Sequence, residues 1–405
     1  MTGRAGNAFD RTEKKHRAER ENRRPIYLDN AATTWPKPMG VARALEESLE
    51  LYGANPGRSS YTMAEDTLLK VLHCRSAVGN FFGLAEPERV VFTPGCTWSI
   101  NTVLKGCLRR GDHVVISDME HNAVVRPLHA LEQRGISVTR AHLFEGDPER
   151  TVASFRAALR RNTRMIFCTG ASNVFGLRAP VKQLGELCRK QGILLGVDAA
   201  QSAGITEAES DTYAADFICA PAHKGLYGTM GLGLLLVCGD TLPEPLAEGG
   251  TGSLSALRSQ PPELPDRLES GTLNVPAICA LEAGIGFLTT IGPDALRRHE
   301  YGITSMLYDG LSGIDGTTLY TAPINSEWHV PLISFNIGDM GSETAAAMLA
   351  ERNIAVRAGF HCAYDAHTVM GTHRRGTVRI CPSAFTTEME AVRFLDAVRE
   401  ICRRV

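Results

Sequence analysis

The sequence has no long apolar run and no surplus of charge of one sign, and each absence excludes a class of protein. No apolar segment of the 405 residues is long enough to span a bilayer, and the N-terminus lacks the apolar core of a secretion signal. The formal net charge of -2 gives no electrostatic reason to expect nucleic acid or an anionic membrane as partner. We therefore predict a cytoplasmic protein that binds neither nucleic acid nor membrane.

The sequence also lacks the short motifs of disulfide, nucleotide and metal sites. The 11 cysteines form no CxxC pair, so in a reducing compartment most are expected to be buried thiols. Neither GxGxxG after a strand nor GK followed by Ser or Thr occurs, which argues against a nucleotide site. His361, Cys362, His367 and His373 have a spacing that fits no tetrahedral site, so we expect no metal.

Apolar strand-like runs alternate with helical periodicity from about residue 63 to 285. The strand candidates are residues 90–92, 114–116, 137–139, 165–167, 193–197, 217–219 and 232–237, and the helix candidates include 64–82, 97–109, 123–134 and 181–191. This alternation predicts an α/β fold with a mostly parallel sheet of seven strands and helices on both faces. Ligands then bind beyond the carboxyl ends of the strands.

The chain divides into four predicted parts. Residues 1–24 are dominated by charge and predict a disordered tail. Residues 25–45 are expected to pack with the smaller domain, and 46–285 form the large domain. Residues 286–405 predict a smaller α+β domain, with helices 293–312, 342–351 and 386–402 and strands 331–336, 354–357 and 376–380.

A glycine-rich polar loop between the last two predicted strands of the large domain contains Lys224. His223 precedes it, and the glycines after it let the backbone approach a bound group closely. A solvated loop lysine is the ordinary alternative. In this setting a lysine can also form a Schiff base with a carbonyl cofactor.

Three other strand ends carry groups that suit a phosphate and a planar ring. A predicted helix begins near Cys96 and Thr97, and unpaired amides at a helix N-terminus can bind a phosphate. His121 follows strand 114–116, where an imidazole can stack on a ring or move a proton. Asn173 can hydrogen-bond a ring substituent. A capped helix that binds nothing and a satisfied core or surface histidine are the alternatives.

A carboxylate ends the apolar strand 193–197. Asp198 would be costly there without a cation, and a protonated pyridine nitrogen fits that need, although an ordinary helix-capping aspartate is common. Gln201 follows and could contact a phenolic oxygen. Together the anion site, the stacking group, the buried acid and the lysine match the requirements of pyridoxal 5'-phosphate.

The chain resembles the cysteine desulfurase family of class V aminotransferase-type proteins, which have pyridoxal phosphate fold type I. The resemblance runs from about residue 25 to 403. It is carried by YLDNAATTWPKP, VVFTPGCTWSIN, DMEHNAVVRP, ASNVFG, VDAAQS, HKGLYG, GGTGS, LESGTLNVPA, RAGFHCA and GTVRICPSAFTTE, in that order.

The resemblance implies roles for these residues at the cofactor. Lys224 would be the Schiff-base lysine, with His223, Cys96 and Thr97 at the phosphate, where two threonines are common in the family. The other predicted cofactor contacts are Asp198 to the pyridinium, Gln201 to the phenolic oxygen, His121 stacked on the ring, Asn173, and Thr251 reaching the phosphate of a neighbouring subunit. A homodimer is therefore implied.

The resemblance also implies the substrate site. Arg379 would bind the substrate carboxylate as a bidentate fork, with Asn30 and Asn173 nearby. Cys362 would be the nucleophile that takes the sulfur of L-cysteine and passes it to an acceptor protein. It is flanked by His361 and Arg357, which we expect to favour its thiolate. A buried structural cysteine is the alternative.

The cysteine segment is most similar to the second desulfurase group, with its short, ordered loop. It departs from that group at Phe360, where histidine is frequent, and throughout 364–375. Selenocysteine lyase activity remains an alternative to L-cysteine desulfuration. So do another aminotransferase or epimerase reaction on this fold and a non-enzymatic role in sulfur relay.

Overall fold

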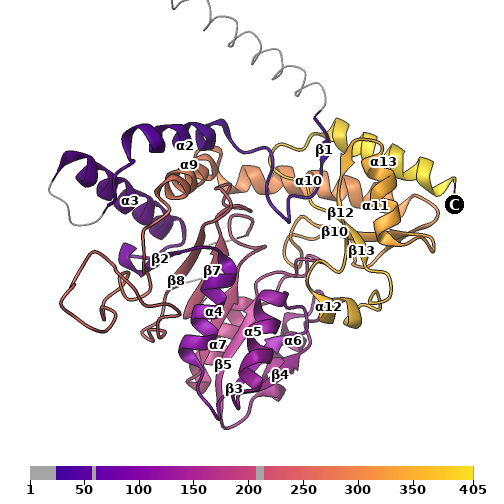
Figure 1. Ribbon diagram of the computed structural model, residues 1–405. Helices are drawn as coiled ribbons and strands as arrows, with labels where there is room; N and C mark the ends of the chain where they lie inside the picture. The colour runs from indigo at the N-terminus through magenta and orange to yellow at the C-terminus, as the bar shows by residue number, and fades with distance from the viewer. Residues whose placement is uncertain (1–23, 57–60, 207–213, 405) are drawn as a thin grey trace, which may run out of the picture.

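The computed structural model describes residues 24–56, 61–206 and 214–404, which form a large and a small domain (Figure 1). Most of the predicted tail, residues 1–23, lies outside the described residues. Within them, all 11 cysteines are free thiols: six are buried, four are partly buried, and Cys362 is exposed. No single described helix is long and apolar enough to cross a membrane. The adjacent helices Val275–Ile291 and Pro293–Ser312 are long and apolar enough only when taken together, and they are bent by 85°.

A mostly parallel sheet of seven strands forms the centre of the large domain, as predicted. Its order, among the described residues, is β2 (Val90–Thr93), β8 (Gly233–Val237), β7 (Phe217–Pro221), β6 (Leu194–Asp198), β5 (Thr163–Thr169), β3 (His113–Ser117) and β4 (Ser137–Ala141). Only β8 runs antiparallel to its neighbours. The carboxyl ends of the other strands therefore lie along one edge, where ligands bind in such folds.

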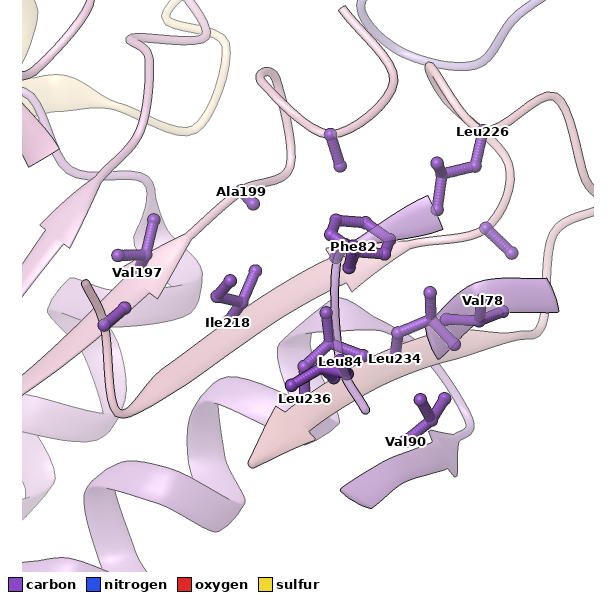
Figure 2. Packing of buried hydrophobic residues seen from close by; sticks show 14 of the residues in the cluster. Val78, Phe82, Leu84, Val90, Val197, Ala199, Ile218, Leu226, Leu234 and Leu236 are labelled. Atoms are coloured by element: carbon purple, nitrogen blue, oxygen red, sulfur yellow. The ribbon is translucent and has the colours of Figure 1, made fainter. Parts of the chain in front are cut away.

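Helices cover both faces of this sheet because successive strand residues point to opposite sides. One face packs on α4 (Cys96–Cys107) and α5 (Asn122–Glu132). The other packs on α3 (Thr62–Phe81), α6 (Pro148–Ala158), α7 (Val181–Gln191) and α9 (Val275–Ile291). Figure 2 shows part of this second core, which contains Val197, Ile218 and Leu234 from three strands together with Phe82.

The small domain has a sheet of four antiparallel strands in the described chain. Their order is β12 (Arg357–Gly359), β13 (Thr377–Ile380), β10 (Ile333–Ile337) and β9 (Thr317–Leu319). The helices of this domain are α10 (Pro293–Ser312), α11 (Ser342–Ala350), α12 (Tyr364–Val369) and α13 (Glu388–Cys402).

The start of the described chain contributes to both domains. Strand β1 (Ile26–Tyr27) pairs in parallel with β11 (Ile354–Ala355), and Ile26 and Leu28 belong to the core of the small domain. Helix α2 (Met39–Leu51) instead lies against α9 of the large domain. The predicted boundary at residue 45 therefore falls inside a helix.

Candidate active site

A cavity of about 790 Å³ opens at the carboxyl ends of the parallel strands. Of the predicted site residues, eight line it: Cys96, Thr97, His121, Asn173, Asp198, Gln201, His223 and Lys224. Four do not: Asn30, Thr251, Cys362 and Arg379. The fold thus gathers the predicted cofactor residues of one chain, Thr251 excepted, around a single space.

Lys224 enters the cavity from the loop between β7 and β8. Burial lowers the pKa of its ammonium, while the carboxylate of Asp198 opposes that shift and the guanidinium of Arg379 adds to it. No hydrogen bond joins its side chain to another residue in the described part of the chain. Its amine is therefore available to react.

Asp198 ends β6 with its side chain buried at 3 % exposure. Oδ1 accepts hydrogen bonds from the amide of Ala200 at 2.9 Å and from the thiol of Cys96 at 3.7 Å. Among the described residues it forms no ion pair. A carboxylate this buried is stabilised by a cation, and a protonated ring nitrogen in the adjacent cavity would supply one.

An anion site lies where α4 begins. Its N-cap, Gly95, supplies no side-chain hydrogen bond, so the first amides of the helix, at Cys96 and Thr97, face the cavity without a side-chain cap. His223 lines the same cavity, and no described group partners its buried Nδ1. Burial and two nearby lysines lower the pKa of His223 to about 4, so it is neutral and can donate one hydrogen bond.

The ring of His121 is held in place by its own helix. It caps α5, with Nδ1 accepting from the amide of Ala123 at 3.0 Å, and burial lowers its pKa. Its neutral form therefore carries the proton on Nε2.

Gln201 donates one amide hydrogen to the carbonyl of Ala31 at 3.0 Å and keeps a second for a ligand.

These features fit pyridoxal 5'-phosphate. The buried Asp198 lacks an ion-pair partner among the described residues. The start of α4 and Nδ1 of His223 have no hydrogen-bond partner there, and Lys224 lines the same cavity. No group of three or more His, Cys, Asp or Glu in the described ranges could hold a metal ion.

The cysteine loop is joined to the rim of the cavity by two hydrogen bonds. The amide of Asn122 donates to the carbonyl of Cys362 at 2.7 Å, and Asn173 Nδ2 donates to the carbonyl of His361 at 2.7 Å. His361 and Cys362 have φ of 47° and 58°, in the left-handed region that costs energy for residues with a side chain. Cys362 is exposed, and its carbonyl is bonded to the residue that follows His121.

The expectation that His361 favours the Cys362 thiolate by its charge is wrong. Its ring is buried, and Nε2 lies 3.0 Å from the carbonyl of Thr377. Burial and the nearby Arg379 lower the pKa of His361 to about 2, so it is neutral. His361 therefore holds the loop to β13 and supplies no positive charge.

Arg379 is buried on β13 and already bonded on two sides. Its guanidinium donates to the carbonyl of Asn173 at 2.8 Å and to Oδ1 of Asp29 at 2.9 Å, while Nε has no partner in the described chain. Asn30 donates to the carbonyls of Tyr27 and Cys381 and so ties the N-terminal segment to the end of β13. Asn30 thus has no amide hydrogen left for a ligand.

Several residues that support the site were not predicted. Asp29 orients Arg379, and Lys37 donates to the carbonyl of His223 at 2.7 Å. Glu120, which precedes His121, accepts hydrogen bonds from the amides of Ser117 and Thr169. Asp29 follows the predicted strand 26–28 directly, so the same reasoning that made Asp198 a candidate could have indicated it.

Comparisons with known proteins agree with this geometry. The family model described as Aminotransferase class-V matches residues 26–394. The chain therefore belongs to the class V aminotransferase family.

Its place within that family follows from its relatives. A probable cysteine desulfurase of Methanothermobacter thermautotrophicus is 34 % identical over 403 residues, covering 97 % of this chain and 98 % of that protein. One of Pyrococcus abyssi is 29 % identical over 388 residues, covering 93 % and 94 %. The predicted resemblance to cysteine desulfurases is confirmed.

Solved structures give the same result. The apo cysteine desulfurase of Thermococcus onnurineus NA1 matches with a TM-score of 0.86 and 28 % identity, covering 94 % of this chain and 95 % of that one. The cysteine desulfurase CsdA of Escherichia coli, in an S-sulfonic acid form, matches with a TM-score of 0.83 and 25 % identity over the same shares. The predicted fold is confirmed.

Proposed function

We propose that this enzyme is a pyridoxal 5'-phosphate-dependent cysteine desulfurase, which converts L-cysteine to L-alanine and leaves a persulfide on Cys362. One observation carries the proposal: the loop of the exposed Cys362 is bonded to the amide of Asn122 and to the side chain of Asn173, at the rim of the cavity that Lys224 lines.

Each cofactor contact is proposed from a group described above. Asp198 would pair with the ring nitrogen, and the first amides of α4 with His223 would hold the phosphate. His121 would lie on the ring, Gln201 would donate to the phenolic oxygen, and Lys224 would attach the cofactor. When bound, the cofactor stores the electron pair released at the substrate Cα.

Lys224 and Arg379 would handle the substrate. Arg379 would bind the α-carboxylate, with its unpartnered Nε as one available donor. The lowered pKa of Lys224 raises the share of its neutral amine, which can take the proton from Cα and return one later. Asn173 supports both Arg379 and the cysteine loop.

The sulfur step would use the Cys362 thiolate. It attacks the substrate sulfur, and an S–S bond forms as the substrate Cβ–S bond breaks. The electron pair of the broken bond stays with the carbon fragment, which gains a proton and leaves as L-alanine. Because Cys362 is exposed, its persulfide would be accessible to an acceptor protein.

The test is to incubate the yellow, cofactor-loaded protein with L-cysteine. We expect L-alanine together with a mass gain of one sulfur on the Cys362 peptide. Cys362→Ser should keep the visible absorbance and yield no sulfide, while Cys402→Ser, which changes a partly exposed cysteine on α13, should behave as wild type. Wild-type rates in Cys362→Ser would refute the persulfide step.

Two finer points belong to the same proposal. Rates on L-selenocysteine and L-cysteine, in wild type and Cys362→Ser, separate desulfuration from selenocysteine lyase activity. Selenium is softer than sulfur, so its removal from the substrate depends less on the Cys362 thiolate.

The free thiols, with the exposed one at Cys362, suit a reducing compartment such as the cytoplasm.

We also propose a homodimer. Thr251 does not line the cavity of its own chain, and its hydroxyl lies 3.1 Å from that of Ser253. Its neighbours Gly250 and Gly252 are exposed, which leaves this segment accessible to a second subunit. Exposed apolar side chains on α3, among them Leu69 at 53 %, offer surface for such contact.

A further inference from the structure

A buried hydrogen-bond relay connects the lysine loop to the small domain. The hydroxyl of Tyr227 donates to Oε1 of Glu300 on α10 at 3.2 Å and accepts from the amide of Ala384, after β13, at 3.0 Å. Glu300 is 4 % exposed and Tyr227 is 1 % exposed. Three segments far apart in the sequence therefore meet at one hydroxyl, which we call the Tyr227 relay.

Tyr227 is coupled directly to the lysine. Its amide donates to the carbonyl of Lys224 at 2.8 Å, so the two residues form one turn. Its φ of 57° lies in the left-handed region, which is uncommon for a bulky residue. The ring packs edge-on against Phe287 at 5.1 Å between centroids, and this packing with the relay holds the strained turn.

The other end of the relay lies close to the substrate-binding side of the site. Ala384 follows Arg379 by five residues on the same connection. A cavity of about 20 Å³ is lined by Lys224 and Gly225 from the lysine loop, by Glu300, and by Ser383. The buried acid and the lysine thus border the same small enclosed space.

We propose that Glu300 is a positioning residue for Lys224, which acts through Tyr227 to fix the lysine loop against the segment that follows Arg379. The inference rests on the proposed function, in which Lys224 and Arg379 must act on one substrate from two domains. Misplacement by about 1 Å can cost up to about a hundredfold in rate, so a fixed separation matters.

The charge on Glu300 sets the strength of the relay. Burial raises its pKa to about 7, opposed by the hydrogen bond from Tyr227 and by the amide of Ala384. The other titratable groups facing this region are Cys381, which interacts with Glu300, and Lys224 across the cavity. The carboxylate accepts the Tyr227 hydrogen bond more strongly than the acid does, so the relay tightens as pH rises through 7.

The experiment compares Tyr227→Phe, Glu300→Gln and Glu300→Ala, with Tyr308→Phe as matched control. Tyr308 lies on the same helix as Glu300 and is also buried, and its hydroxyl donates to the carbonyl of Thr321 at 2.7 Å. We expect Tyr227→Phe and Glu300→Ala to lower kcat for L-cysteine about tenfold with KM changed less than threefold. Glu300→Gln, which keeps an acceptor, should hold kcat within threefold at pH 7 but lose the pH dependence near 7.

Two further readouts do not depend on desulfurase activity. Without substrate, the pH midpoint of the visible absorbance of the bound cofactor should shift in Tyr227→Phe and not in Tyr308→Phe. Amide exchange in the peptide 222–232 should become faster in Tyr227→Phe than in the control. If kcat, absorbance midpoint and exchange in Tyr227→Phe all match Tyr308→Phe, the inference is wrong. If wild type forms no alanine, the proposed function is wrong. The amide exchange of peptide 222–232 then still tests whether the Tyr227 relay holds the lysine loop.

Discussion

The carboxyl group of Glu120 lies one residue before His121 and is only 1 % exposed. Oε1 accepts from the amide of Thr169 at 2.8 Å and from the amide and hydroxyl of Ser117, while Oε2 has no partner within the described ranges. It therefore joins the ends of β3 and β5. Burial raises its pKa to about 8, so the acid is mostly neutral at pH 7.

Glu120→Gln should flatten the pH dependence of stability. The native pKa lies above the ordinary value of 4.5, so the stability that Glu120 contributes is complete below pH 4.5 and is lost as pH rises through 8. Gln cannot ionise, and from pH 5 to 9 the Tm of the variant should therefore rise relative to wild type. Glu50→Gln, an exposed carboxyl on α2, is the control. A Tm difference that stays constant with pH would contradict the argument.

Single residues were predictable where the reason was local. Asp198 and Lys224 follow apolar strands, which made them candidates; their predicted roles came from the combination of strand-end groups and from the family resemblance. Asp29 was missed because the group it binds, the guanidinium of Arg379, is 350 residues away in the sequence. Glu300 was missed because its hydrogen-bond partner Tyr227 is 73 residues away. The bond from the Cys96 thiol to Asp198 was also missed, since the sequence alone does not give the rotamer.

At the scale of elements, the strands of the large domain were predicted to within about two residues. Most of them are buried apolar runs, and β4 (Ser137–Ala141), which is only partly buried, is the exception. The predicted helix 181–191 matches α7, Val181–Gln191, at both ends. Helix α6 was missed because only Thr151 and Phe155 on it are buried, too few for an apolar stripe. Its capping aspartate and Pro148 were the available signal.

Thr387→Ala should loosen helix α13. Thr387 accepts from the amide of Glu390 at 3.2 Å, and the Glu390 carboxylate accepts from the amide of Thr387 at 2.8 Å, which forms a capping box. Loss of the cap should cost about 1 kcal/mol of stability and speed amide exchange in the first turn of α13. Thr290→Ala, an exposed threonine near the end of α9, should change neither.

At the scale of the whole molecule, the site is assembled from two domains and, we propose, completed by a second chain. Light scattering should give about twice the 43.9 kDa of one chain. Thr251→Ala should weaken cofactor binding without changing that mass, because only a contact to the phosphate is removed. A particle of single-chain mass that binds cofactor fully would contradict this arrangement.

The pairing of β1 with β11 joins Ile26 to Ile354. Leu28 adds two bonds to the same junction, to the carbonyl of Ala355 at 2.9 Å and from the amide of Cys381 at 2.7 Å. During synthesis the large sheet, which ends at Val237, can form long before these partners leave the ribosome. Strand β1, the first in the described part of the chain, therefore stays without its neighbours until almost all of the protein has been made, and closing this junction is a late step of folding.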